Sequence, residues 1–187
     1  MERQDTQLGG HVAPSLVMDE IDTPRLRLRA ITRDDVDLLV ALDADPEVMR
    51  FISGGSPSSR SDVVETTEAS LGHRWIATER STDNFVGWFG LRPSAAAEAE
   101  LGYRLQRSAW GNGYASEGAR AVIDLGFRQR ELERIWAQTM TVNESSRRVM
   151  DACGMRYVRT FHMDWGEVID GSEEGDVEYE LLRRDYL

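Results

Sequence analysis

Cysteine is nearly absent from this chain of 187 residues, in which Cys153 stands alone. A single cysteine cannot form an intrachain disulfide, and this is typical of proteins kept in the reducing cytoplasm. Basic residues are also in the minority: 22 Lys and Arg face 33 Asp and Glu, which gives a formal charge of −11. Non-specific nucleic-acid binding needs a basic surface. We therefore expect a cytoplasmic protein with no nucleic-acid partner.

Long apolar runs are missing as well. No run approaches the roughly 18–20 residues that a membrane-spanning helix needs, and the N-terminus lacks a basic region followed by an apolar one, so we expect no membrane association and no secretion signal. His11, His73 and His162 are scattered without the spacing of metal ligands, which predicts no metal site. Residues 1–22 are polar and aperiodic and should form a loosely ordered arm. Residues 23–187 then fit one domain.

The order of the predicted elements indicates the fold class. Strands are expected at residues 25–29, 74–78, 85–91, 101–105, 134–140, 156–161 and 177–182, and helices within 32–71, from the end of the glycine loop at residue 115 to residue 127, and at 144–153. The second and third strands make a hairpin that the fourth extends. The helix between the fourth and fifth strands makes a right-handed crossover, which gives a parallel pair. The chain is therefore predicted to be α/β (α+β), with a mixed, mostly antiparallel twisted sheet flanked by helices.

A glycine loop at residues 110–115, Trp-Gly-Asn-Gly-Tyr-Ala, joins the fourth strand to an amphipathic helix. The first N–H groups of such a helix have no partner and face anions, which predicts a pyrophosphate site. Ser116 stands where a dinucleotide fingerprint needs its third glycine, and no Gly-Lys-Ser/Thr of a P-loop is present. By itself the loop is equally compatible with a tight turn in which glycine supplies a positive φ.

The residues around this loop carry a family resemblance. The run GYRLQRSAWGNGYASEG is followed about thirty residues on by NESSRRVMDACGM, and it is preceded by TPRLRLRAITRDDVDLLVALDADPEVMRFI and FVGWFGL. Together these segments resemble the GNAT superfamily of acyl-CoA-dependent N-acyltransferases, and more narrowly the branch of the ribosomal-protein-alanine N-acetyltransferases. The resemblance covers roughly residues 23–186. Trp110 takes the place of the Gln or Arg that begins the superfamily's phosphate loop.

The resemblance implies acetyl-CoA as cosubstrate and no metal. It implies that the strand at residues 103–105 splays from the next strand and offers backbone groups to the pantetheine arm, with an N–H near Leu105 polarising the thioester carbonyl. Asn143, a good helix N-cap, would also bind the pantetheine or a water. The cofactor-binding residues implied are Tyr103, Arg104, Leu105, Gly111, Asn112, Gly113, Tyr114, Ala115, Ser116 and Asn143.

Two residues are candidates for proton transfer. Glu100, at the start of the central strand, would accept the proton of the amine, and its alternative is a salt bridge at the strand edge. Ser146, at the family's N-x-x-Ser position, would protonate the departing thiolate, and its alternative is a bond to backbone in the first helical turn. Met150 stands where many superfamily members have a tyrosine acid on this helix, and Tyr157, beyond the helix, is a poor substitute.

These features predict an N-acetyltransferase in which a primary amine attacks acetyl-CoA directly in a ternary complex. The acceptor would be a protein N-terminus or a small molecule, and the resemblance is compatible with a homodimer. The alternative is a non-catalytic acyl-CoA sensor with the same fold, which the missing tyrosine allows. The acidic segment 164–176 would favour cationic amines if it borders the cleft. A weaker alternative, aminoglycoside acylation, is suggested by that segment alone.

Overall fold

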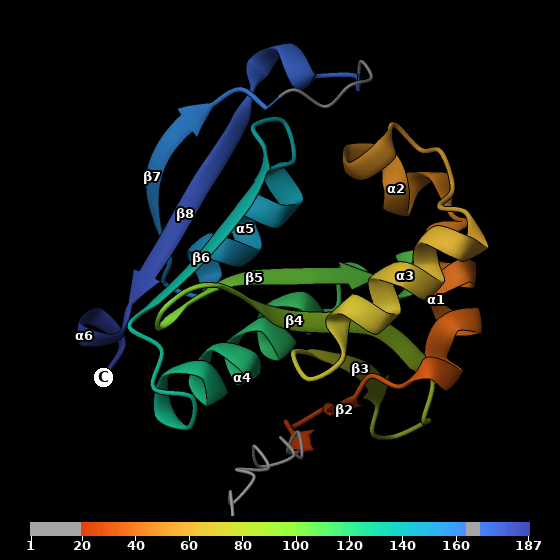
Figure 1. Ribbon diagram of the computed structural model, residues 1–187, viewed down its shortest axis with the longest axis horizontal. Coiled ribbons are helices and arrows are strands. Elements are labelled where there is room, and N and C mark those ends of the chain that lie inside the picture. The colour runs from red at the N-terminus through yellow and green to blue at the C-terminus, as the bar shows by residue number, and fades with distance from the viewer. Residues whose placement is uncertain (1–19, 164–168) are drawn as a thin grey trace, which may run out of the picture.

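A mixed β-sheet forms the centre of the molecule (Figure 1). Within residues 20–163 and 169–187, which the computed structural model describes, eight strands lie in the order β1-β2-β3-β4-β5-β6-β8-β7. Neighbouring strands among these are antiparallel, except that β5 and β6 are parallel. This arrangement confirms the predicted mixed, mostly antiparallel sheet.

The bounds of the elements follow the predicted order. The strands are β1 Ile21–Asp22, β2 Leu26–Ala30, β3 Arg74–Glu79, β4 Phe85–Ala95, β5 Glu98–Leu105, β6 Arg134–Met140, β7 Arg156–Phe161 and β8 Asp176–Leu182. The helices are α1 Val36–Asp43, α2 Pro46–Ser53, α3 Arg60–Ser70, α4 Tyr114–Arg128, α5 Glu144–Ala152 and α6 Arg183–Tyr186, with 3-10 turns at Arg33–Asp35, Arg107–Ala109 and Ser172–Glu174. None of these helices is both long enough and apolar enough to cross a bilayer.

The expected N-terminal arm ends inside the sheet. Ile21 and Asp22 form β1, which pairs with Leu28 and Arg27 of β2. The ordered fold therefore begins before residue 23, where the sequence predicted it to begin. A strand of two residues is too short to produce an alternation pattern, which explains why the sequence did not reveal it. The rest of the expected arm, up to residue 19, lies outside the described residues.

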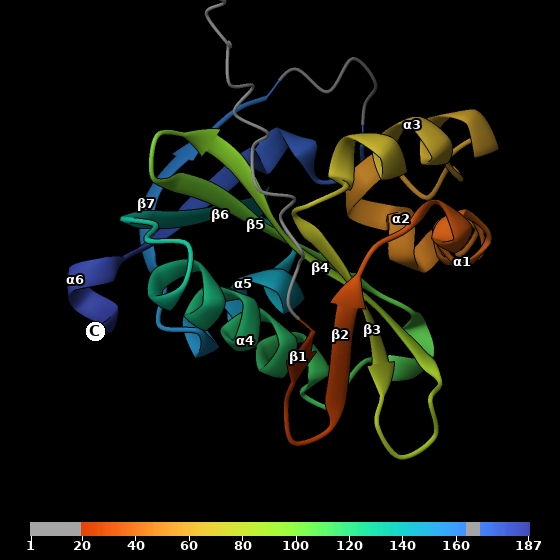
Figure 2. The same cartoon turned by 60° about the horizontal axis from the view of Figure 1, so that its bottom comes forward.

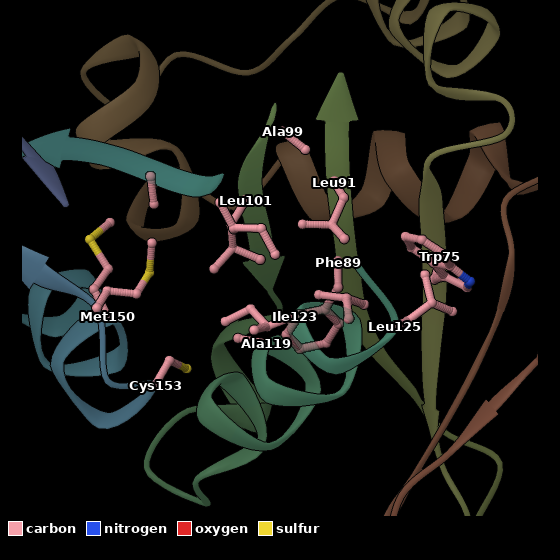
Figure 3. Close-up of a cluster of buried hydrophobic side chains, with 14 of the residues drawn as sticks. Trp75, Phe89, Leu91, Ala99, Leu101, Ala119, Ile123, Leu125, Met150 and Cys153 are labelled. Carbon is pink, nitrogen blue, oxygen red and sulfur yellow. The ribbon is translucent and has the colours of Figure 1, made fainter. Parts of the chain in front are cut away.

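Helices cover both faces of the central strands, with α4 and α5 on one side and α1 and α3 on the other (Figure 2). Trp75 and Phe89 are fully buried on the side covered by α4 and α5, and the apolar face of α4 packs against them (Figure 3). Ile76, the next residue along β3, packs on the other side with the residues of α1 and α3. The period-2 alternation of strands produces this division. Each layer thus has its own apolar cluster, and β3, β4 and β5 are held from both faces.

The parallel strands β5 and β6 are paired only where they begin. Their register covers Glu98–Glu100 against Arg134–Trp136, and beyond these residues β5 stays with β4 while β6 stays with β8. The two strands diverge visibly in Figure 1. The family resemblance implied this separation, and the structure confirms it.

An ion-pair cluster lies at the paired end of β5 and β6, which we call the waist of the sheet (Glu98–Glu100 with Arg134–Trp136). The guanidinium of Arg134 contacts Glu98 at 3.0 Å, Glu178 at 2.5 Å and Glu180 at 2.7 Å. Burial lowers the pKa of Arg134, but the hydrogen bonds that its guanidinium donates to these glutamates outweigh burial and raise the pKa. The cluster therefore connects β5, β6 and β8 at the point from which the gap opens.

Candidate active site

A cavity of about 890 Å³ occupies the gap between the diverging strands. One wall comes from the inner edge of β5 and the glycine loop, the second from β6 and the start of α5, and the third from α2. Residues that line it include Phe51, Trp88, Glu100, Tyr103, Arg104, Leu105, Gly111, Gly113, Tyr114, Ala115, Ser116, Gln138, Asn143, Ser146 and Met150. The cavity therefore brings together eleven of the twelve predicted site residues, all but Asn112, together with α2, which the sequence did not associate with the site.

The backbone of β5 presents alternate residues to the cavity. Gln106 donates its N–H to the carbonyl of Val86 at 3.0 Å. In an antiparallel pair, the N–H groups of successive residues point alternately toward the partner strand and away from it. The N–H of Arg104, two residues before Gln106, therefore points to Trp88 of β4, while those of Tyr103 and Leu105 point into the gap. The backbone N–H of Arg104 is therefore used within the sheet, and those of Tyr103 and Leu105 are the ones that face the gap.

The side chain of Arg104 turns to the other face of the sheet instead. Its guanidinium forms a partly buried ion pair with Asp43 of α1. The guanidinium of Arg74 stacks on the neighbouring Trp88 ring at 4.0 Å from the centroid. Burial, aided by the charge of Arg104, lowers the pKa of Arg74 to about 10. The guanidinium groups of both Arg74 and Arg104 thus lie over the Trp88 ring, and Asp43 is ion-paired with Arg104.

The glycine loop has the geometry expected of an anion site. Gly111 and Gly113 have φ of +75° and +78°, and Gly113 is the N-cap of α4 without a side-chain cap. The first N–H groups of α4, at residues 114–116, have no partner within the helix because helix starts leave them unpaired. Asn112 differs from its neighbours: it does not line the cavity, and its amide donates to the carbonyls of Ala109 and Trp110. Its side chain shapes the loop.

Arg25 and Glu117 hold this loop from outside the cavity. Arg25 donates to the carbonyl of Asn112 at 2.8 Å and to the Glu117 carboxylate at 2.7 Å. Thr23 donates to the same carboxylate at 2.6 Å. Burial pushes the pKa of Glu117 up, but the hydrogen bonds from Thr23 and Arg25 outweigh it and keep the pKa below its usual range. Local sequence patterns do not reveal this contact, because Arg25 and Glu117 are 92 residues apart.

The start of α5 places two predicted residues against the cavity. The side-chain carbonyl of Asn143 accepts from the N–H of Ser146 at 3.2 Å, which confirms the N-cap. The Asn143 amide donates to the hydroxyl of Thr139 at 3.0 Å. The Ser146 hydroxyl lies 2.9 Å from the hydroxyl of Tyr103 on β5. Ser146 thus contacts a side chain on another element.

Glu100 lies at the waist, at the inner end of the cavity. Its carboxylate is ion-paired with Arg92, its cross-strand neighbour on β4. The side chain is 16% exposed and lines the cavity. The salt bridge named as the alternative for Glu100 is therefore present, and the carboxylate also faces the space where an acceptor would bind.

Met150 and Cys153 belong to the apolar core under the cavity (Figure 3). Met150 is 1% exposed. Cys153 is buried in the core cluster, and burial raises the pKa of its thiol to about 11, which disfavours a nucleophile. No three His, Cys, Asp or Glu side chains converge as a metal site in the part of the chain that the structure describes.

The described part of the acidic segment touches the cavity at one end. Met163, which precedes the segment, and the buried Asp176, which ends it, both line the cavity. Glu173 and Glu174 are exposed. Residues 164–168, which include Asp164 and Glu167, lie outside the described residues. The described part of the segment therefore borders the cleft at Asp176.

Comparison with known proteins identifies the family to which this chain is similar. Residues 25–156 match the model of the acetyltransferase (GNAT) domain. The FsC-acetyl coenzyme A-N(2)-transacetylase of Aspergillus fumigatus is 30% identical over 89% of this chain and 77% of its own length. A GNAT-family acetyltransferase from Bacillus anthracis has a TM-score of 0.75 at 25% identity, over 89% of this chain and 99% of that chain.

A third likeness concerns the fold. A ribosomal L7/L12 alpha-N-protein acetyltransferase, solved in complex with coenzyme A, has a TM-score of 0.72 at 18% identity, over 88% of this chain and 98% of that chain. Fold, cavity and relatives together define an acyltransferase that uses coenzyme A thioesters. The chain belongs to the GNAT acetyltransferase family. It is an acetyl-CoA-dependent N-acetyltransferase, and this enzyme assignment is favoured over the alternative of a non-catalytic acyl-CoA sensor.

Proposed function

We propose that this enzyme transfers the acetyl group of acetyl-CoA to a primary amine by direct attack, with both substrates bound between β5 and β6. The observation that carries the proposal is the continuous cavity, which joins the glycine loop, the open edge of β5 and the Glu100 carboxylate. Acetyl-CoA would lie with its pyrophosphate on the N–H groups of residues 111–116. Its pantetheine would follow Tyr103 and Leu105 as an added strand does.

The thioester would then lie where the strands separate. The N–H of Leu105 would polarise the thioester carbonyl, since a donor in a partly dry site stabilises developing negative charge. The amine nitrogen attacks the carbonyl carbon, the C–N bond forms, and the C–S bond breaks as its electron pair leaves with sulfur. Glu100 would take the proton released by the amine, directly or through a water.

A covalent acyl-enzyme is not part of the proposal. Cys153 is buried and its thiol has a raised pKa, so it lacks the thiolate that would attack. Ser146 has no histidine or carboxylate among its described hydrogen-bond partners to act as a base. The amine must therefore attack the thioester itself.

The acceptor class is open between a small molecule and a protein N-terminus. A spermidine N-acetyltransferase from Vibrio cholerae with the same fold acts on a small amine by its name, and the name of the ribosomal enzyme indicates a protein N-terminus. A cytoplasmic location is proposed from the single cysteine, and a homodimer stays a prediction.

Free thiol release tests the proposal directly. The protein is incubated with acetyl-CoA and either small amines or N-terminal peptides, each paired with its N-blocked form, and the products are identified by mass spectrometry. Thiol release that requires a free amine supports the reaction. Tight acetyl-CoA binding, measured by calorimetry, without release on any acceptor would overturn it.

A further inference from the structure

The hydroxyl of Tyr103 contacts Ser146 across the cavity floor. It lies 2.9 Å from the Ser146 hydroxyl and 3.1 Å from the Ser146 carbonyl oxygen. Tyr103 comes from β5 and Ser146 from the first turn of α5, so 43 residues separate them in sequence. Both residues line the cavity. The contact therefore lies next to the space in which the thioester would bind.

The Ser146 proton can take two directions. If the Tyr103 hydroxyl donates to the Ser146 carbonyl, the Ser146 hydroxyl can donate to Tyr103, and its proton points away from the cavity. If Tyr103 instead donates to the Ser146 hydroxyl, the serine proton is free to point to another acceptor. A hydroxyl has one proton and two lone pairs, so the two states exclude each other. An acceptor in the cavity selects the second state.

Tyr103 itself is poorly suited to give up its proton. Burial raises the pKa of Tyr103 well above its usual range, and the hydrogen bond with Ser146 offsets this only in part. A coenzyme A thiolate has the basicity of a thiol with a pKa of about 8.5, so proton transfer from Tyr103 to sulfur would be strongly uphill. Tyr103 therefore stays neutral and serves as a hydrogen-bond donor.

We propose that Tyr103 is a positioning residue that directs the Ser146 hydroxyl at the sulfur of the departing coenzyme A. The inference rests on the proposed acetyl transfer and adds a role that the backbone contacts of Tyr103 do not cover. When the C–S bond breaks, its electron pair moves to sulfur, and the Ser146 O–H donates to that charge while the Tyr103 O–H donates to the serine oxygen. No proton leaves Tyr103, and the thiolate is later protonated by solvent.

This arrangement also explains how α5 can supply a hydrogen-bond donor to the departing sulfur although Met150, and not a tyrosine, stands on this helix. Met150 offers no proton, and its side chain fills space that the apolar cluster needs. The donor at the cavity comes instead from the preceding turn of α5, and its direction is fixed from β5. Stabilisation of a thiolate by donation is sufficient because a thiolate is a fairly stable leaving group.

Three variants test the proposal: Tyr103→Phe, Ser146→Ala and the double variant. Each single change removes one hydrogen bond that stabilises the negative charge forming on sulfur. The kcat should therefore fall by about tenfold or more, as expected for hydrogen bonds to charged groups. The double variant should be no slower than the slower single variant, because both changes interrupt one relay. The Kd of coenzyme A should change less than about twofold in calorimetry, since the backbone donors remain.

Tyr157→Phe is the matched control. Tyr157 also places its hydroxyl 2.9 Å from a hydroxyl, that of Thr160, but on the exposed strand β7. Its removal should leave kcat and Kd unchanged.

The outcomes separate the proposal from a structural role of Tyr103. If Tyr103 only ties β5 to α5 through the Ser146 carbonyl, Ser146→Ala would keep wild-type kcat while Tyr103→Phe would weaken coenzyme A binding. That result, or an unchanged kcat in Tyr103→Phe, overturns the proposal. A wild-type protein that acetylates no amine would instead defeat the proposed function, and the two failures are therefore distinct.

Discussion

Replacement of Gly113 by aspartate gives the sharpest test of the pyrophosphate loop. Gly113 is the N-cap of α4 with φ of +78°, and a side chain there would meet only the Arg25 guanidinium, 3.4 Å from the Cβ position. Asparagine and aspartate both tolerate a left-handed backbone better than other residues with side chains. Gly113→Asn and Gly113→Asp therefore share the same strain and bulk, and they differ in one charge.

The size of the charge effect can be worked from the exposure of the loop. Two unit charges about 6 Å apart repel by ~0.7 kcal/mol in water and by ~2.8 kcal/mol at an effective dielectric constant of about 20. Gly111 and Gly113 are exposed, which favours the lower value, but a pyrophosphate carries at least two charges. Arg25 gives little compensation because it is already paired with Glu117. We expect Gly113→Asp to weaken coenzyme A binding about 10- to 100-fold relative to Gly113→Asn.

Isothermal titration calorimetry at low and high salt measures this difference. The gap in Kd between the two variants should narrow as salt rises, because salt screens exposed charges. Gly154→Asp is the control, since Gly154 also has a positive φ, of +79°, with no atom within 4 Å of its Cβ position, but lies at the other end of α5. Equal Kd values for Gly113→Asp and Gly113→Asn would remove the pyrophosphate from this loop.

Three further changes test other parts of the site and core. Glu100→Gln should lower kcat by about 100-fold or more if the carboxylate is the general base. Arg92→Gln breaks the same ion pair but should keep most of the rate. Equal losses of kcat in the two variants would show that Glu100 acts only through this ion pair. Gly118→Ala puts a methyl group 2.3 Å from the buried ring of Phe89, so calorimetric melting should show a loss of about 1–3 kcal/mol and a Tm lower by about 2–10 °C. Cys153, with a pKa raised to about 11 by burial, should react with a thiol reagent at pH 8 only after unfolding, because about 0.1% is thiolate at that pH, and rapid labelling of the folded protein would contradict its burial.

Local patterns in the sequence predicted most of the fold. The alternation of residues 25–29 identified β2, in which the alternating Leu26 and Leu28 are fully buried. The helical spacing of α4 identified the face that packs on Phe89. Each of these predictions needs only the period of a helix or strand and a buried side.

The site was less visible because its contacts join distant segments. The pairing of Glu100 with Arg92 depends on the irregular register of the turn between β4 and β5. The direction of the Arg104 backbone depends on the phase of the ladder, which sequence periodicity does not fix. The contact of Tyr103 with Ser146 has no local signature, because it arises only when β5 and α5 meet.

The waist of the sheet has a mechanical consequence. From Glu100 to Leu105, the part of β5 that is not paired with β6 extends about 17 Å, at about 3.3 Å per residue. A rotation of about 5° at the waist would move the far end by about 1.5 Å over that length, which is comparable to half a hydrogen bond. The ion pairs of Arg134 with three glutamates lie at the point about which such a rotation would occur. By resisting the rotation, they would keep the N–H of Leu105 in a fixed position relative to a bound thioester.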